Sequence, residues 1–82
     1  MDFEYQTKQE ADAVALSLKH LLGTAIKHIK TEAICNVKDV YPYPKIIRSD
    51  GADNIKGYDV RISFGNQPFT TNSKALEVAF II

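Results

Sequence analysis

The longest regular pattern in the chain runs from Thr7 to Lys30, where apolar residues recur with the 3.6-residue period of an amphipathic helix. Thr7-Lys8-Gln9-Glu10 forms a capping-box pattern, in which the Thr hydroxyl accepts the amide hydrogen of Glu10. The apolar residues gather in one arc: Ala11, Val14, Ala15, Leu18, Leu21, Leu22, Ala25, Ile26 and Ile29. We therefore predict a long N-terminal helix over this whole stretch, with the arc packed against a core.

Beyond the helix the period changes from 3.6 to two, which indicates β-strands. Ala33 to Lys38 alternates in this way, and Tyr58 to Phe64 does so most clearly. The apolar face of the clearest strand carries Tyr58, Val60, Ile62 and Phe64. Lys45 to Arg48 can form a further short strand, and Ser49 to Asn54 has the composition of a turn.

Two proline-marked segments flank these strands. Val40-Tyr41-Pro42-Tyr43-Pro44 lacks two amide donors at alternate positions, so we expect a linker or an edge there and not a central strand. Gly65-Asn66 suits a tight type II′ hairpin. Gln67 to Thr71 would then form the return strand, confined to a sheet edge by its proline.

The last segment, Ser73 to Ile82, fits either a helix or a strand. Asn72 or Ser73 can cap a helix, whereas the β-branched and aromatic tail favours a strand. We prefer the helix and keep the strand as the alternative. The chain as a whole predicts an α+β fold, in which the long helix packs on an antiparallel sheet of about three to four strands.

Composition indicates one domain over residues 1–82, because the chain is short and 45% of its residues are hydrophobic. Ten basic residues balance ten acidic ones, whereas generic polyanion binders carry a basic excess. Cys35 is the one cysteine, which fits a reducing compartment, and we expect the cytoplasm. The N-terminus has no apolar signal core, and no apolar run approaches the roughly 20 residues of a membrane span.

No residue pattern in the sequence indicates catalysis, a metal site or a cofactor. His20 and His28 lie eight residues apart, whereas a helical metal site prefers a pair four residues apart and a third ligand. Cys35 lies on the apolar face of its strand with no base nearby in the sequence, which predicts a buried, unreactive thiol. We therefore expect no catalytic residue, no metal and no cofactor, and a protein that is not an enzyme.

Two classes of function remain. The first is a small interaction protein, an adaptor, an inhibitor or a self-associating subunit, which binds a protein partner and most simply a second copy of itself. The expected contact residues are Leu16 and Gly23 on the outer helix face, or Leu76, Phe80 and Ile82 in the tail. In an alternative arrangement, the tail folds back and completes the monomer core.

The second class is a weak nucleic-acid-binding module that uses the basic face of the long helix. The residues of this face are Lys8, Lys19, Lys27 and Lys30. From Pro44 onward, the order of elements ending in Ser73-Lys74-Ala75 also resembles the second half of a double-stranded-RNA-binding domain. In that family a Ser-Lys-Lys run begins the final helix and contacts phosphates. The third residue of the run is alanine here, so we assign no family on this resemblance.

Overall fold

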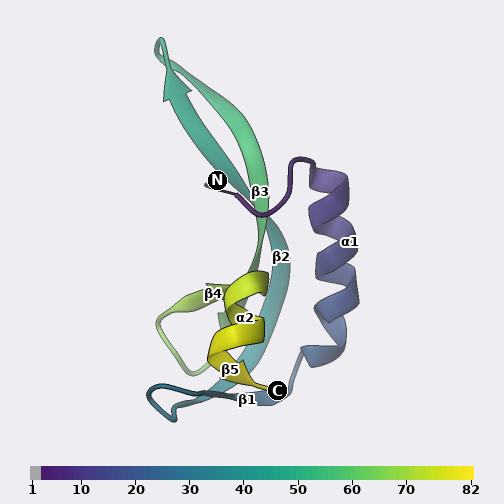
Figure 1. Cartoon of the computed structure of the whole chain (residues 1–82), viewed down its shortest axis with the longest axis vertical. Helices are drawn as coiled ribbons and strands as arrows, with labels where there is room; N and C mark the ends of the chain where they lie inside the picture. The colour runs from purple at the N-terminus through teal and green to yellow at the C-terminus, as the bar shows by residue number, and fades with distance from the viewer. Residues whose placement is uncertain (1–2) are drawn as a thin grey trace.

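In the computed structural model, which describes residues 3–82, one antiparallel sheet packs one face against two helices (Figure 1). The elements are α1 (Lys8–Leu18), the 3₁₀ turn η1 (Lys19–Leu21), β1 (Ala25–His28), β2 (Ile34–Ser49), β3 (Ala52–Phe64), β4 (Thr70–Asn72), α2 (Ser73–Ala79) and β5 (Phe80–Ile81). The five strands are ordered β4-β3-β2-β1-β5. This confirms the α+β class, although the sheet has more strands than the three to four expected.

The N-terminal helix is shorter than its apolar pattern predicts. Its start is as expected, because Thr7 Oγ1 accepts the Glu10 N–H at 3.1 Å. The helix ends at Leu18, η1 ends at Leu21, and Gly23 then adopts a left-handed φ of +80° that stops any helix. The prediction of a helix to Lys30 is therefore wrong, and residues 25–28 form a strand instead.

The turn at Gly23 gives a direct test of this chain reversal. The Gly23 N–H donates to the Val37 carbonyl at 2.9 Å, which ties the turn to β2. A Cβ at Gly23 would meet no atom within 4 Å, so Gly23→Ala should cost about 1 kcal/mol of stability through backbone strain alone. Gly65→Ala is the matched control, since Gly65 has no positive φ, and it should cost less in the same urea titration. Equal losses would contradict this reading of the turn.

The proline segment lies inside β2 and is not a linker. β2 pairs with β3 from Val37 to Ser49, but β1 pairs only with residues 34–36, so Pro42 and Pro44 lie where β2 has one neighbour. Pro44 is opposite Tyr58, whose N–H and C=O both bond to Tyr5 at 2.7 and 2.8 Å. The Pro44 nitrogen therefore faces the open side of β2, as does that of Pro42 two residues earlier. This local edge agrees with the expected edge position.

The two turns that flank β3 differ from each other. Asp50 and Gly51 have φ of +52° and +76°, which makes a two-residue hairpin turn between β2 and β3. The expected type II′ turn at Gly65-Asn66 is wrong, because Gly65 has no positive φ and a loop over residues 65–69 precedes β4. Asn66 bridges this loop to β2, since its side chain accepts the Asn36 N–H at 2.8 Å and donates to the Ile34 carbonyl at 2.9 Å. The return strand is thus Thr70–Asn72 and not Gln67 to Thr71.

The C-terminal segment is a helix followed by a short strand. The preferred helix and the alternative strand are therefore each correct for part of it. The Asn72 side chain caps α2 by accepting the Ala75 N–H at 2.8 Å. Phe80 and Ile81 then pair with His28 and Lys27 of β1. The tail therefore folds back onto the sheet of its own chain.

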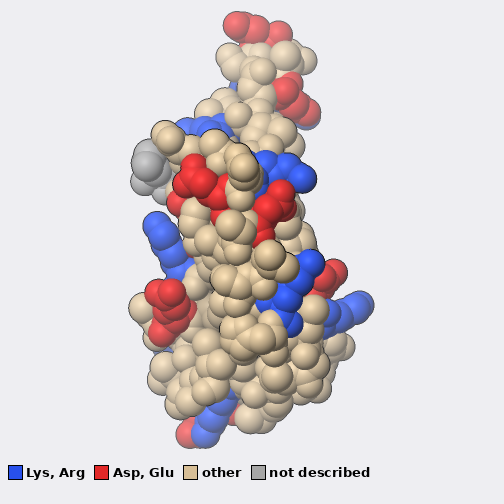
Figure 2. Space-filling model, turned by 90° about the vertical axis from the view of Figure 1, so that its right-hand side faces the viewer, with Lys and Arg blue, Asp and Glu red and all other residues tan. Residues whose placement is uncertain are grey.

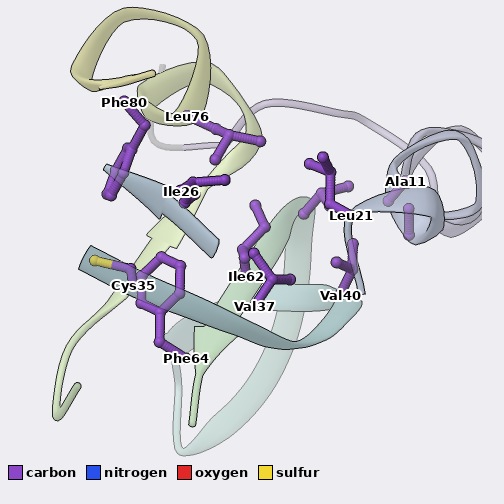
Figure 3. Close-up of a cluster of buried hydrophobic side chains, with 12 residues drawn as sticks. Ala11, Leu21, Ile26, Cys35, Val37, Val40, Ile62, Phe64, Leu76 and Phe80 are labelled. Carbon is purple, nitrogen blue, oxygen red and sulfur yellow. The ribbon is translucent and has the colours of Figure 1, made fainter. Parts of the chain in front are cut away.

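The core lies between this sheet face and the two helices. Figure 3 shows side chains of both helices pointing toward those of β1, β2 and β3. The buried residues of the core are Ala11, Ala15, Leu21, Ile26, Cys35, Val37, Val40, Val60, Ile62, Phe64, Leu76 and Phe80. The core thus includes the predicted face of Tyr58 to Phe64, except that Tyr58 itself is half-buried at its margin.

Candidate interaction surface

The most prominent surface feature is the far end of the β2–β3 hairpin, which extends beyond both helices (Figure 1). We call residues 45–56 the hairpin arm. The molecule measures 43 × 24 × 20 Å, and its radius of gyration is 13.7 Å, whereas a compact chain of this length has about 12 Å. Its accessible surface of 5425 Å² exceeds by about 500 Å² the value of about 4,900 Å² typical of a 9.2 kDa monomer. The arm therefore leaves extra surface in contact with solvent.

An isoleucine pair occupies the arm on the same side of the sheet as the core. Along β2, side chains alternate, so Ile46 shares its face with buried Val40. Lys56 is an extra residue in β3, and after it Ile55 lies directly opposite Ile46. Ile46 is 58% exposed and Ile55 is 56% exposed. The apolar face of the sheet thus continues onto the arm, where neither helix covers it.

The N-terminal residues hold the base of the arm in place. Tyr5 pairs with Tyr58 as a short extra strand, and the Glu4 N–H donates to Asp59 Oδ1 at 2.9 Å. Asp59 is buried and lies 3.6 Å from the Lys45 ammonium, which balances its charge. Because these contacts fix β2 and β3 where they leave the core, the arm has an anchored base.

A second set of contacts joins the N-terminal segment to α2. Glu4 Oε2 accepts the Ser73 hydroxyl at 2.5 Å and the Lys74 N–H at 3.1 Å. The start of α2 therefore already holds a carboxylate of the same chain. This occupies the position where the Ser-Lys-Lys run of double-stranded-RNA-binding domains contacts phosphate, so the structure gives no support to the resemblance.

Charges of both signs lie around the isoleucine pair. Arg48 Nε and Asp53 Oδ1 form an ion pair at 3.0 Å near the tip, and Asp50 lies in the turn. Figure 2 shows acidic side chains at the tip and charges of both signs between the tip and the body. Lys8, at the N-terminus of α1, pairs with Asp12 at 3.5 Å. The arm thus combines an apolar centre with charges of both signs around it, and Asp50 lies at its tip.

The structure separates the residues that the sequence suggested for a protein contact. Leu16 is 69% exposed on α1, but Gly23 belongs to the turn after η1, so the helical face that they were expected to share does not form. Leu76 and Phe80 are buried in the monomer core, which removes them from the surface of the folded chain. Ile82 remains exposed at the C-terminus.

The lysines expected to form one basic helix face lie on separate elements. Lys8 is in α1, Lys19 in η1, Lys27 in β1 and Lys30 in the turn after β1. Lys27 also faces Glu32, with 3.8 Å between the ammonium and the carboxylate. The single basic face of the sequence-based expectation is therefore not formed.

Groups that could support chemistry are sparse in the part of the chain that the structure describes. Cys35 is buried, and desolvation raises the pKa of its thiol, so the protonated form is favoured at neutral pH. Among residues 3–82, no three His, Cys, Asp or Glu side chains gather in a metal-binding arrangement. Within the same residues, neither helix has the length and apolar character needed to cross a membrane.

Comparison with protein-family models, with curated proteins and with solved structures finds no match to this chain. Inference about function therefore rests on the chain's own surface. The isoleucine pair was missed at the sequence level, although a signal was present. Ile46 and Ile55 lie on either side of Asp50-Gly51, and apolar residues that flank an Asp-Gly pair are typical of a β-hairpin.

Proposed function

We propose that this chain is a small, non-catalytic interaction protein whose binding element is the hairpin arm. The observation that carries the proposal is the exposed Ile46–Ile55 pair on an anchored extension of the core face. Neighbouring apolar side chains that stay exposed on a monomer often mark an interaction site. Burying this surface against a partner releases water from apolar side chains and favours association.

The same features favour a protein partner over a nucleic acid. Affinity for a polyanion comes mainly from cations that contact phosphates. The arm instead places two isoleucines at its centre, Lys45 and Arg48 of the arm are already paired with Asp59 and Asp53, and the whole chain has a net charge of zero. An apolar centre with a charged margin is the arrangement found at protein interfaces.

A reducing compartment such as the cytoplasm suits this protein best in our proposal. Cys35 is buried and unpaired, and its thiol contributes to the core as a small apolar group. In an oxidising compartment, an unpaired cysteine is exposed to disulfide exchange whenever the chain opens.

Photocrosslinking in cells that express the chain naturally tests this function. Benzoylphenylalanine replaces Ile55 on the arm or, as a matched control, Val78 on α2, which is 77% exposed. We expect a discrete protein adduct from position 55, weakened by Ile46→Ser in the same chain, and none from position 78. Adducts of equal yield at both positions, or no adduct at position 55, would refute the arm as the binding element.

A further inference from the structure

We propose that the arm's partner is a second copy of this chain, with two arms packed face to face and antiparallel about a two-fold axis at the isoleucine pairs. This inference rests on the proposed function of the arm. A two-fold contact uses the same patch on both copies, so the patch must be complementary to itself. The apolar centre and the charges on either side of it meet that condition.

The centre of the contact is the isoleucine pair. Ile46 and Ile55 lie side by side across β2 and β3. A two-fold axis through this point places the two isoleucines of one arm against those of the other. Each copy then covers the apolar surface that the helices of the other copy leave exposed.

The charges on either side of the centre support the antiparallel arrangement. Asp50 lies four residues beyond Ile46, about 13 Å along the strand. On the other side of the pair, Lys8 follows Tyr5 by three residues, and Tyr5 pairs with Tyr58 at the base of the arm. Antiparallel packing therefore brings Asp50 at the tip of each arm toward Lys8 and the N-terminus of α1 in the other copy. Lys8 pairs with Asp12 of its own chain at 3.5 Å, and because this pair is exposed, Asp50 of the other copy can join or replace it, which the helix dipole also favours.

The prolines of β2 hinder edge-to-edge joining of two sheets along this strand at the base of the arm. The nitrogens of Pro42 and Pro44 face its open side and carry no hydrogen to donate to an added strand. Because the isoleucine pair lies on the face of the arm, we place the contact on that face and not on its edge. A contact confined to one arm per copy is small beside the roughly 800 Å² per partner of a standard interface, so we expect a weak dimer with a micromolar dissociation constant.

Sedimentation velocity on the purified full chain, from 5 to 500 μM in roughly tenfold steps, tests the dimer. We expect a concentration-dependent dimer in the wild type. In Ile55→Asp the dissociation constant of the dimer should rise about 100-fold or more, because the change acts in both copies. Val78→Asp is the matched control and should leave the dimer intact, since Val78 is exposed on α2. Ile46→Ser gives a milder second arm variant, and circular dichroism checks that each variant is folded.

A wild-type chain that stays monomeric throughout this series overturns the second-copy proposal, as does a dimer that both arm variants leave unchanged. The two levels of inference fail separately. A photocrosslinked adduct at Ile55 whose added mass differs from 9.2 kDa refutes the second copy but supports the interaction function of the arm. The absence of any adduct at that position refutes both.

A double-mutant cycle tests the antiparallel register. Asp50→Asn keeps a residue type that tolerates the left-handed φ of +52°, and Lys8→Gln removes the charge at the start of α1. Each change alone should weaken the dimer about threefold, and the two together should weaken it no more than either alone. Strictly additive effects would overturn the predicted contact between the tip and α1.

Discussion

Val60→Asp should prevent the chain from folding. Val60 is fully buried in β3, within the core that both helices share. An aspartate there has no cationic partner among the core residues, so it must either remain charged in an apolar site or be protonated at a cost in free energy. A domain of this size has little stability to lose. The far-ultraviolet circular dichroism spectrum should show an unfolded chain at 25 °C, with no cooperative melt.

Ile55→Asp provides the control for this experiment on the same strand. It introduces the same side chain five residues away, on the same side of the sheet, where the isoleucine is more than half exposed. We expect a melting curve close to that of the wild type when both are measured at a concentration low enough to suppress association. A folded Val60→Asp variant would show that the core is misplaced, and an unfolded Ile55→Asp variant would show that the arm is part of it.

The strand from Tyr58 to Phe64 was predictable because its pattern allows one period. Val60, Ile62 and Phe64 alternate with polar residues, and no helical arrangement places them together. The end of the N-terminal helix was not predictable in the same way. Ile26 fits the apolar arc of a helix, and it also fits the core face of β1, where it is buried. Gly23 was the signal that decides between them, but it was interpreted as a contact residue on the outer face of the helix.

The arm was missed for a different physical reason. Hydrophobic patterning shows which residues share a face, but it does not show whether another element covers that face. Ile46 and Val40 lie on the same face of β2. The helix α1, which begins at Lys8, does not extend over the arm, so Val40 is buried and Ile46 is exposed. The functional surface therefore depends on where the helix starts relative to the hairpin, which only the folded structure reveals.

The C-terminal tail shows the same dependence on a long-range contact. Its burial requires β1 as a pairing partner for Phe80, and a chain interpreted as helical to Lys30 contains no such strand. One error in the N-terminal half thus left the tail without an internal partner. This is why Leu76 and Phe80 were expected at an interface as well as in a completed monomer core.

Leu76→Ala distinguishes these two roles of the tail. Leu76 is 1% exposed in α2, so its truncation should lower the free energy of unfolding by about 3 kcal/mol, through lost burial and the cavity that remains. Val78→Ala, in the same helix but exposed, should lower it by less than about 0.5 kcal/mol. Urea titrations at low micromolar concentration measure both values without a contribution from association. If Leu76→Ala instead left the unfolding free energy unchanged and weakened the dimer, Leu76 would belong to the partner surface, and the arm would lose its place as the principal contact.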